Sequence, residues 1–247
     1  MFNYTPSPTL LTDRIILITG AGDGIGRAAA KSFAAHGATV ILLGRTIKKL
    51  ETVYDEIEEA GHPQPAIYPM NLEGATPDDY ENLANTLATE FGQLNGLLHN
   101  ASLLGTLTPI EHYVIKRWYQ VMQVNLNAPF LLTKACLGLM KRAQDASIVF
   151  TSSSVGRKGR AYWGAYAVSK FATEGMMQIL ANEVEANTNI RVNSLNPGAT
   201  RTAMRAAAYP GEDAMTLPPP EAIMPLYLYL MGPDSREING QALNAQD

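Results

Sequence analysis

The fold expected for this chain follows from one segment, Arg14 to Leu43, which reads RIILITGAGDGIGRAAAKSFAAHGATVILL. It begins with a short apolar run, Arg14 to Thr19, typical of a central parallel strand that is covered on both faces. A glycine-rich turn follows, and then an alanine-rich helical pattern that ends at Gly37. A second apolar run, Ala38 to Leu43, completes a unit of strand, glycine-rich turn, helix and strand. This βαβ unit is the one that binds dinucleotides.

The glycines of the turn stand at positions 20, 22, 24 and 26, so the relevant pattern is Gly20-x-x-x-Gly24-x-Gly26. A tight turn needs backbone angles that glycine adopts readily, and a pyrophosphate must approach a backbone that carries no Cβ there. The helix that follows offers free N–H groups and a positive dipole to the phosphates. The position of the glycines between a strand and a helix makes the pattern specific for dinucleotide binding.

The end of the second apolar run bears on the choice between NAD and NADP. An acidic residue at this point binds the adenosine ribose and repels a 2′-phosphate. This chain instead reads Leu43-Gly44-Arg45-Thr46, with an arginine and no carboxylate. The pattern favours NADP(H), with Arg45 binding the phosphate. NAD(H) is the alternative, with Arg45 as a surface residue at the start of the next helix.

The rest of the chain alternates in the same way and predicts an α/β fold. We expect one Rossmann-type domain over residues 14–247, a doubly wound parallel sheet with helices on both faces. Residues 1–13 are expected to form a surface arm, and residues 203–218 an irregular, mobile substrate lid. Further strands are expected at 65–70, 94–99, 147–150, 190–195 and 241–243. Helices are expected at 46–60, 76–91, 111–142 and 219–231, and another helix carries Tyr166 and continues to residue 186.

Composition narrows the classes of function. The net charge of −4 argues against a broad nucleic-acid-binding surface. The single cysteine, Cys136, cannot form an internal disulfide and is expected to be a buried apolar residue. No secretory signal pattern opens the chain, and no segment approaches the ~18 uninterrupted apolar residues of a membrane span. We therefore expect a cytoplasmic protein that binds no nucleic acid, membrane or metal.

A second segment, Phe150 to Lys170, carries residues suited to proton transfer. Tyr166 and Lys170 are four residues apart and share one face of a helix, and Ser153 lies at the exit of the preceding strand. An ordinary tyrosine has a pKa of about 10, and a lysine ammonium one turn away would lower it. Tyr166 could then act as an acid or base, while Ser153 stabilises negative charge on a substrate oxygen. Taken by itself, the Tyr–Lys spacing also fits a surface pair.

These motifs resemble the short-chain dehydrogenase/reductase family over nearly the whole chain. Residues 13–27, 150–178 and 196–206 are similar to the bacterial YciK-type oxidoreductases, a subgroup of that family. The motifs occur in the order and at the spacing of the family: Thr19-Gly20-x-x-x-Gly24-x-Gly26, Asn100-Ala101, Asn125, Ser153, Tyr166-x-x-x-Lys170 and Pro197-Gly198-x-x-x-Thr202.

The resemblance implies a role for each motif residue. It implies that Tyr166 is the general acid in reduction and the base in oxidation, and that Ser153 polarises the substrate oxygen. Lys170 would lower the pKa of Tyr166 and bind the nicotinamide ribose, and Asn125 would hold a water that links Lys170 to solvent. Cofactor binding is implied for a larger set: Gly20, Gly22, Asp23, Gly24, Ile25, Arg45, Asn71, Leu72, Asn100, Ala101, Tyr166, Lys170, Pro197, Gly198, Thr200 and Thr202.

The chain departs from the family pattern at several positions. Asn71 stands where an aspartate is frequent, and Ser102 replaces the glycine of Asn-Ala-Gly. His99 stands where an asparagine is common, and is expected to be a buried, hydrogen-bonded histidine. Asp23 occupies a position that is often basic in NADP-dependent members, so binding of the 2′-phosphate would depend mainly on Arg45.

The sequence therefore predicts an NADP(H)-dependent oxidoreductase that transfers hydride between the nicotinamide and a carbonyl or alcohol. The alternatives are an NAD-dependent alcohol dehydrogenase and a non-catalytic NADP(H)-binding sensor or scaffold. The family also implies a homodimer or homotetramer formed through the helices that carry Asn125 and Tyr166.

Inference about the substrate depends on position in the chain. Residues 102–109, Tyr162, Trp163 and residues 204–217 are expected to line a pocket for a bulky apolar carbonyl compound. Two interpretations are open for five basic residues nearby: attraction of an anionic group, or ordinary surface or interface charge, which the sequence alone favours. These residues are Arg157, Lys158, Arg160, Arg201 and Arg205.

Overall fold

A sheet of seven parallel strands lies at the centre of the structure, a computed structural model in which residues 1–246 are described. The strand order is β3-β2-β1-β4-β5-β6-β7, and each neighbouring pair is parallel. The strands are β1 (Ile15–Thr19), β2 (Thr39–Gly44), β3 (Ala66–Pro69), β4 (Gly96–His99), β5 (Ala146–Thr151), β6 (Ile190–Asn196) and β7 (Ala242–Asn244).

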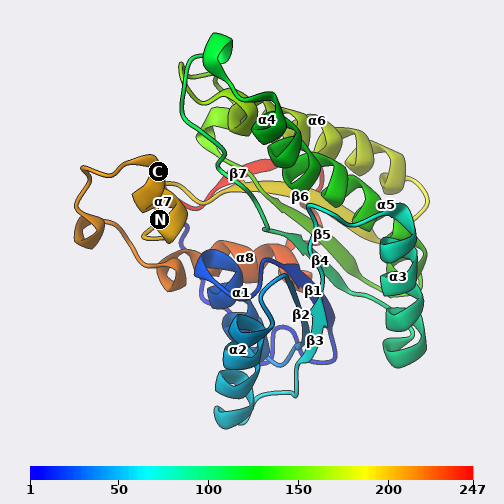
Figure 1. The fold of residues 1–247 in the computed structure, drawn as a ribbon. Helices are drawn as coiled ribbons and strands as arrows, with labels where there is room; N and C mark the ends of the chain where they lie inside the picture. Colours follow the sequence, from blue (N-terminus) through cyan, green and yellow to red (C-terminus); the bar gives the residue numbers. More distant parts are fainter. Residues whose placement is uncertain (247) are drawn as a thin grey trace.

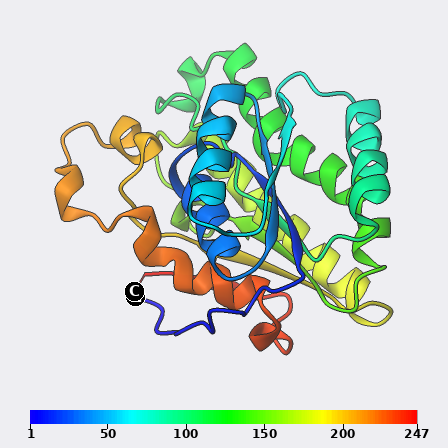
Figure 2. The ribbon, with the colours of Figure 1, turned by 90° about the horizontal axis from the view of Figure 1, so that it is seen from below.

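Helices cover both faces of this sheet, which confirms the predicted doubly wound α/β fold (Figure 1). One face carries α1 (Gly24–Ala35), α2 (Ile47–Glu59) and α8 (Met224–Met231), which lie side by side in Figure 2. The other face carries α3 (Pro77–Phe91), α4 (Ile115–Met122), α5 (Ala128–Met140) and α6 (Gly164–Glu185). Within residues 1–246, no helix combines the length and apolar character needed to cross a membrane.

The strands supply apolar side chains to both helical layers. On β1, Ile16 and Ile18 pack in one core cluster with Phe33 of α1, whereas Leu17 packs in the other with Leu132 of α5. Successive side chains of a strand point to opposite faces, so a strand covered on both sides is apolar throughout. This is why the sequence of β1 reads as a continuous apolar run.

The order of the strands places a crevice beside β1. The chain winds outward from β1 to β2 and β3, returns to β4 on the other side of β1, and continues to β7. Winding reverses between β1 and β4, and ligands of such sheets bind at the carboxyl ends of the strands where it reverses. Gly20 follows β1 and Asn100 follows β4, so both motifs lie at this point.

The long helical segment predicted for residues 111–142 is interrupted in the structure. A 3-10 turn, η1 (Ile110–His112), precedes α4, and a π-helical turn, η2 (Gln123–Asn127), separates α4 from α5. Pro129 has no N–H to bond the carbonyl of Asn125, four residues earlier, so the regular hydrogen-bond ladder cannot continue there. Asn125 therefore lies in a π turn, a feature often found at functional sites.

The two segments expected to lie outside the packed domain are more ordered than the sequence predicts. In the N-terminal arm, Leu11 is fully buried and its backbone N donates to His36 O (2.9 Å). The segment 203–218 is not irregular throughout, because it contains α7 (Ala203–Ala208) and a 3-10 turn, η4 (Ala214–Thr216). Thr202 Oγ1 accepts from Arg205 N (3.1 Å) and so caps α7, whose alanines favour a helix.

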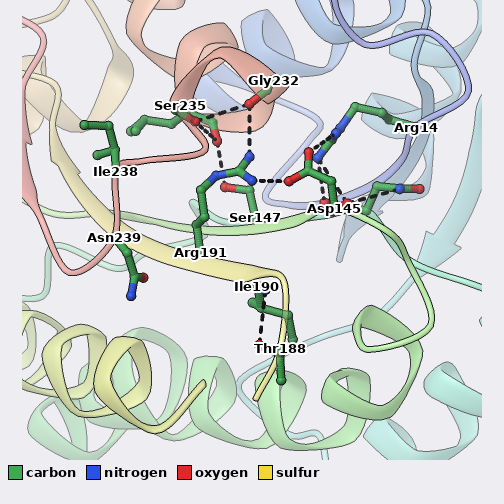
Figure 3. Close-up of polar contacts among 12 residues, drawn as sticks. Arg14, Asp145, Ser147, Thr188, Ile190, Arg191, Gly232, Ser235, Ile238 and Asn239 are labelled. Atoms are coloured by element: carbon green, nitrogen blue, oxygen red, sulfur yellow. Dashed lines mark hydrogen bonds and ion pairs between the residues drawn. The ribbon is translucent and has the colours of Figure 1, made fainter. Parts of the chain in front are cut away.

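A buried ion-pair network joins the amino ends of three strands, at the edge of the sheet opposite to the crevice (Figure 3). Asp145, just before β5, accepts from Arg14 Nη1 (2.5 Å) and pairs with Arg191 of β6. Arg191 also donates to Gly232 O (3.0 Å). Burial opposes ionisation of Asp145, but the two arginines hold the pKa of its carboxyl below the ordinary value.

Candidate active site

A cleft of about 940 Å³ opens along the carboxyl ends of the strands. All the residues predicted to bind the cofactor line it, from Gly20 in the glycine-rich turn to Thr202 before α7. Ser153, Tyr166 and Lys170 line the same cleft. Asn125 is 2% exposed and lies behind its wall, next to Val124, which faces it. The structure thus brings the separate sequence motifs together in one place.

The glycine-rich turn is built for close approach. Gly20 has φ +69°, and a Cβ added to Gly26 would lie 2.1 Å from Gly20 O. The hydroxyl of Thr19 accepts from the backbone N of Asn100 (2.9 Å) and of Ala101 (3.0 Å), which ties the ends of β1 and β4 together. The glycines make this turn a cradle of backbone at the start of α1, a shape that suits the approach of a pyrophosphate.

Basic side chains gather at the end of the cleft beside β2. Arg45 follows directly after this strand, is exposed, and makes no ion pair within residues 1–246. Lys49 of α2 also lines the cleft and its Nζ lies 2.5 Å from Asp23 Oδ2. This hydrogen bond lowers the pKa of Asp23, which also accepts from Gly24 N (2.8 Å) as the cap of α1. The positive charge of Lys49 therefore neutralises the negative charge of Asp23 at this end of the cleft.

Ser153, Tyr166 and Lys170 meet where β5 ends. Ser153 follows β5, and Tyr166 and Lys170 lie one turn apart on α6. Lys170 Nζ donates to Thr151 O (2.7 Å) and lies 5.5 Å from the centre of the Tyr166 ring. A Cβ added to Gly156 would lie 2.8 Å from Lys170 Cβ, so a glycine is needed for the loop to approach α6 this closely.

The ionisation of these groups differs from the sequence prediction. Burial raises the pKa of Tyr166 to about 12, and its hydrogen bond with Ser153 only partly opposes this. Burial lowers the pKa of Lys170 to about 8, against the charge of Glu174. The pKa of Tyr166 is therefore raised overall and not lowered as predicted, because loss of hydration outweighs the other interactions at this depth. At neutral pH Tyr166 is a phenol and can donate a proton.

Behind this group lies a buried carboxylate, Glu174, one turn after Lys170 on α6. Its oxygens accept from Ser152 Oγ (2.6 Å), from Ser194 Oγ (2.6 Å) and from Arg157 Nε (3.0 Å). Arg157 is thus part of the scaffold, a role that neither interpretation from the sequence (attraction of an anionic group, or ordinary surface or interface charge) included. The network fixes Ser152, the neighbour of Ser153, against α6 and β6.

Asn125 joins the wall of the cleft to α6. Its Oδ1 accepts from Leu103 N (2.7 Å), and its Nδ2 donates to Leu103 O (2.9 Å) and to Ser169 Oγ (3.0 Å). Ser169 Oγ in turn donates to Tyr166 O (2.7 Å). The side chain of Asn125 therefore positions both the loop after β4 and the helix of Tyr166, whereas the water relay stays a prediction.

Comparison with known proteins decides the family. The model of the short chain dehydrogenase family matches residues 14–213, most of the chain. The chain belongs to the short-chain dehydrogenase family. It is 53% identical over 244 residues to a protein of Escherichia coli K12 named "Uncharacterized oxidoreductase YciK". The aligned region covers 99% of this chain and 96% of the relative. The predicted similarity to the YciK subgroup is thereby confirmed, and the chain is an oxidoreductase of this family.

Solved structures of other members are similar throughout. A short chain dehydrogenase of Pseudomonas syringae is 62% identical and superposes with a TM-score of 0.98 over 100% of both chains. A second member, from Escherichia coli CFT073, was crystallised as a complex with NADPH. It is 54% identical, with a TM-score of 0.95 over 98% of this chain and 100% of the relative.

Lys49 and Gln246 are among the residues of the dehydrogenase cleft that sequence reasoning missed. Lys49 stands four residues after Arg45, at the start of a helix, so its position beside the same end of the cleft could have been inferred. Gln246 near the C-terminus also lines the cleft, and its Nε2 donates to Pro197 O (2.7 Å) and Ala199 O (3.1 Å). No local pattern in the sequence indicates this second contact.

Two buried residues outside the lining of the dehydrogenase cleft behave as the sequence predicts. His99 is buried, stacks on Phe150 with 4.7 Å between ring centres, and shares a hydrogen bond with Thr133 Oγ1 (2.8 Å). Burial lowers its pKa to about 3, so the ring is neutral. Cys136 is also buried, which raises the pKa of its thiol to about 12. Both are packing residues and not catalysts.

Proposed function

We propose that this dehydrogenase transfers hydride between NADP(H) and a carbonyl or alcohol substrate, with Tyr166 as the general acid in reduction and the base in oxidation. One observation carries this proposal. The group of Ser153, Tyr166 and Lys170 lies in the same cleft as the glycine-rich cradle. A proton donor and a dinucleotide site that share one cleft fit a reaction in which a hydride and a proton reach one carbonyl group.

The cleft fits NADP(H) from end to end. The cradle at Gly20 and Gly26 leaves room for a pyrophosphate, and Arg45 offers a guanidinium without an ion-pair partner in residues 1–246 to the 2′-phosphate. Arginine binds phosphate through charge-assisted hydrogen bonds. A relative that is 54% identical was crystallised with NADPH. Asn71 and Leu72, which follow β3, are assigned to the adenine end, and Thr200, which follows β6, to the nicotinamide end.

The chain supplies the proton and the orientation of the reacting groups. When bound, NADPH would supply a hydride to the carbonyl carbon. Ser153 donates a hydrogen bond to the carbonyl oxygen, and the phenol of Tyr166 gives its proton to the same oxygen as negative charge develops there. Lys170 binds the nicotinamide ribose and stabilises the resulting phenolate. Asn125 maintains the position of α6, and the segment 203–218 acts as a lid over the substrate.

The choice of cofactor is tested by replacing Arg45 with alanine. We expect NADPH affinity to fall by about 10–100-fold, because hydrogen bonds to charged groups contribute about 1.5–3 kcal/mol each. NADH affinity should stay unchanged. Titration of protein with each cofactor, followed by nicotinamide fluorescence, measures both values.

Lys48→Ala is the matched control, because Lys48 is an exposed neighbour on α2 that does not line the cleft. Equal losses of NADPH affinity in both variants, or a wild-type preference for NADH, would contradict the assignment of Arg45. The second result would favour the NAD-dependent alcohol dehydrogenase instead.

We further propose a homo-oligomer formed through α4, α5 and α6. Phe171 and Ile179 of α6 are 44% and 62% exposed, and Ile115 and Tyr119 of α4 and Phe130 of α5 are also exposed. Large apolar side chains exposed together on one helical layer are typical of an interface. The double variant Phe171→Lys and Ile179→Lys should therefore be monomeric, while wild type is a dimer or tetramer in analytical ultracentrifugation.

Ile47→Lys is the control for this prediction, since Ile47 is similarly exposed but lies on α2, in the opposite layer. It should leave the oligomer intact. A monomeric wild type at micromolar concentration would show that the exposed face has another purpose.

A further inference from the structure

The basic residues of the cleft differ in whether a carboxylate neutralises them. Lys49 pairs with Asp23, and Arg205 forms two hydrogen bonds of 2.6 Å with the carboxylate of Glu212. Three others that line the cleft make no ion pair with any residue of the described part of the chain: Arg45, Lys170 and Arg160. The proposed function gives Arg45 and Lys170 roles in binding NADP(H). It leaves the charge of Arg160 unexplained.

Arg160 lies at the substrate end of the cleft, beyond the aromatic wall next to Tyr166. The Trp163 ring lies 5.8 Å from the Tyr166 ring and also 5.8 Å from the Tyr209 ring. Arg160 Nη1 donates to Tyr209 Oη (2.8 Å). Two ring-to-ring steps therefore separate the proposed proton donor from the side chain that holds Arg160.

Tyr209 is itself held in place. The Arg205 guanidinium lies 3.8 Å from the centre of the Tyr209 ring, and Glu212 fixes this guanidinium with two hydrogen bonds. Stacking on an aromatic face and bidentate pairing are both favourable for arginine. The charge of Arg205 is thereby neutralised by Glu212. Arg160 is instead held by a hydrogen bond to a hydroxyl, so no carboxylate neutralises its charge and it can bind an anion.

The loop between Arg160 and Trp163 carries backbone strain. Tyr162 has φ +74°, a conformation that residues other than glycine rarely adopt. Its carbonyl accepts from Thr108 N (3.0 Å), and Trp163 N donates to Arg160 O (3.3 Å). Strain of this kind persists where surrounding contacts hold it, and it gathers at ligand sites. Here it fixes the direction in which Arg160 and Trp163 leave the loop.

From these observations we infer that the substrate carries an anionic group, such as a carboxylate, that Arg160 binds while the carbonyl lies at Tyr166. This inference rests on the proposed function and deepens it. The wall between the two ends is apolar, with Leu104, Trp163 and Met204 packed around Tyr166. The substrate class is therefore an oxo acid or hydroxy acid with an apolar body between its two polar ends. For Arg160 we thus propose the anion-binding role over the ordinary surface or interface charge that residue pattern alone favours.

The test uses oxo acids of three lengths, each paired with its uncharged methyl ester: 4-formylbenzoate, 4-formylcinnamate and 9-oxononanoate. The kcat/KM of NADPH oxidation is measured for wild type, Arg160→Met, Arg160→Lys and Lys158→Met. Lys158 is the matched control because it is exposed on the same loop but does not line the cleft. Binding of the corresponding hydroxy acids and hydroxy esters is measured separately by calorimetry, with NADP+ present.

We expect wild type to prefer at least one acid over its ester by about tenfold or more, as a charged hydrogen bond implies. Added salt should reduce the preference for the acid. Arg160→Met should abolish this preference without lowering kcat/KM for the ester, and Arg160→Lys should retain part of the preference. Lys158→Met should leave it unchanged. Equal use of every acid and its ester by wild type, or equal losses of both in Arg160→Met, would overturn the inference.

The two measurements separate this inference from the proposed function. Reduction of the aldehydes without any preference for acids would leave the oxidoreductase proposal standing and overturn the anion site. Binding that favours the hydroxy acids and depends on Arg160, without reduction of any aldehyde, would support the anion site and contradict the proposed reaction.

Discussion

Replacing Tyr166 with phenylalanine should lower kcat for carbonyl reduction by about 10³-fold, the size expected when a general acid is lost. The variant removes one oxygen atom from a side chain whose ring already packs against Val155 and Trp163. The fold and the affinity for NADPH should therefore remain. Steady-state reduction and NADPH titration of the same preparations measure the two quantities.

The dependence of reduction on pH follows from the same site. Tyr166, with a pKa of about 12, stays protonated over the working range. Lys170, with a pKa of about 8, loses its charge as the pH rises. We therefore expect kcat/KM, which reports groups of the free enzyme, to fall as the pH rises through about 8. Turnover by Tyr166→Phe that equals wild type would show that another group provides the proton.

Replacing Asp145 with asparagine should lower the free energy of unfolding by about 3–5 kcal/mol, because it leaves two buried arginines without a counter-charge. The side chains of Arg14 and Arg191 are 9% and 5% exposed. The folded-state pKa of Asp145 is below its ordinary value, so this stabilisation is present at neutral pH and is lost as the pH falls through that pKa. Urea unfolding at neutral pH measures the change.

Asp55→Asn is the control for this prediction, since Asp55 is exposed on α2 and makes no ion pair within the described residues. It should change the free energy of unfolding little. A similar stability for Asp145→Asn and wild type would show that the network is not a source of stability. Because the network lies at the far edge of the sheet, NADPH affinity should be unchanged in folded Asp145→Asn.

The parts of the fold that depend on local pattern could be predicted from the sequence. The turn from Gly20 to Gly26 lies between an apolar strand and an alanine-rich helix, and each of these signals is contained in a few neighbouring residues. The same is true of Tyr166 and Lys170, whose spacing places them on one face of a helix. The order of the motifs along the chain then indicates which strand ends meet.

The remaining features depend on single residues that meet across long distances in the chain. Nothing in the sequence pairs Arg157 with Glu174, or Gln246 with the backbone around Pro197, because neither contact has a periodicity. The pKa of Tyr166 depends on burial, which residue spacing does not reveal. The π turn at Asn125 is different, because Pro129 four residues later is a local signal that could have been used.

The central claim, that this chain transfers hydride from NADPH to a carbonyl with Tyr166 as proton donor, is tested most directly with deuterium. NADPH labelled at nicotinamide C4 is incubated with wild type and a panel of aldehydes and ketones, and the alcohols are analysed by mass spectrometry. We predict alcohols with one deuterium on the former carbonyl carbon from wild type and almost none from Tyr166→Phe. Tight binding of NADPH without labelled alcohol from any member of the panel would contradict the account and favour a non-catalytic NADP(H)-binding protein.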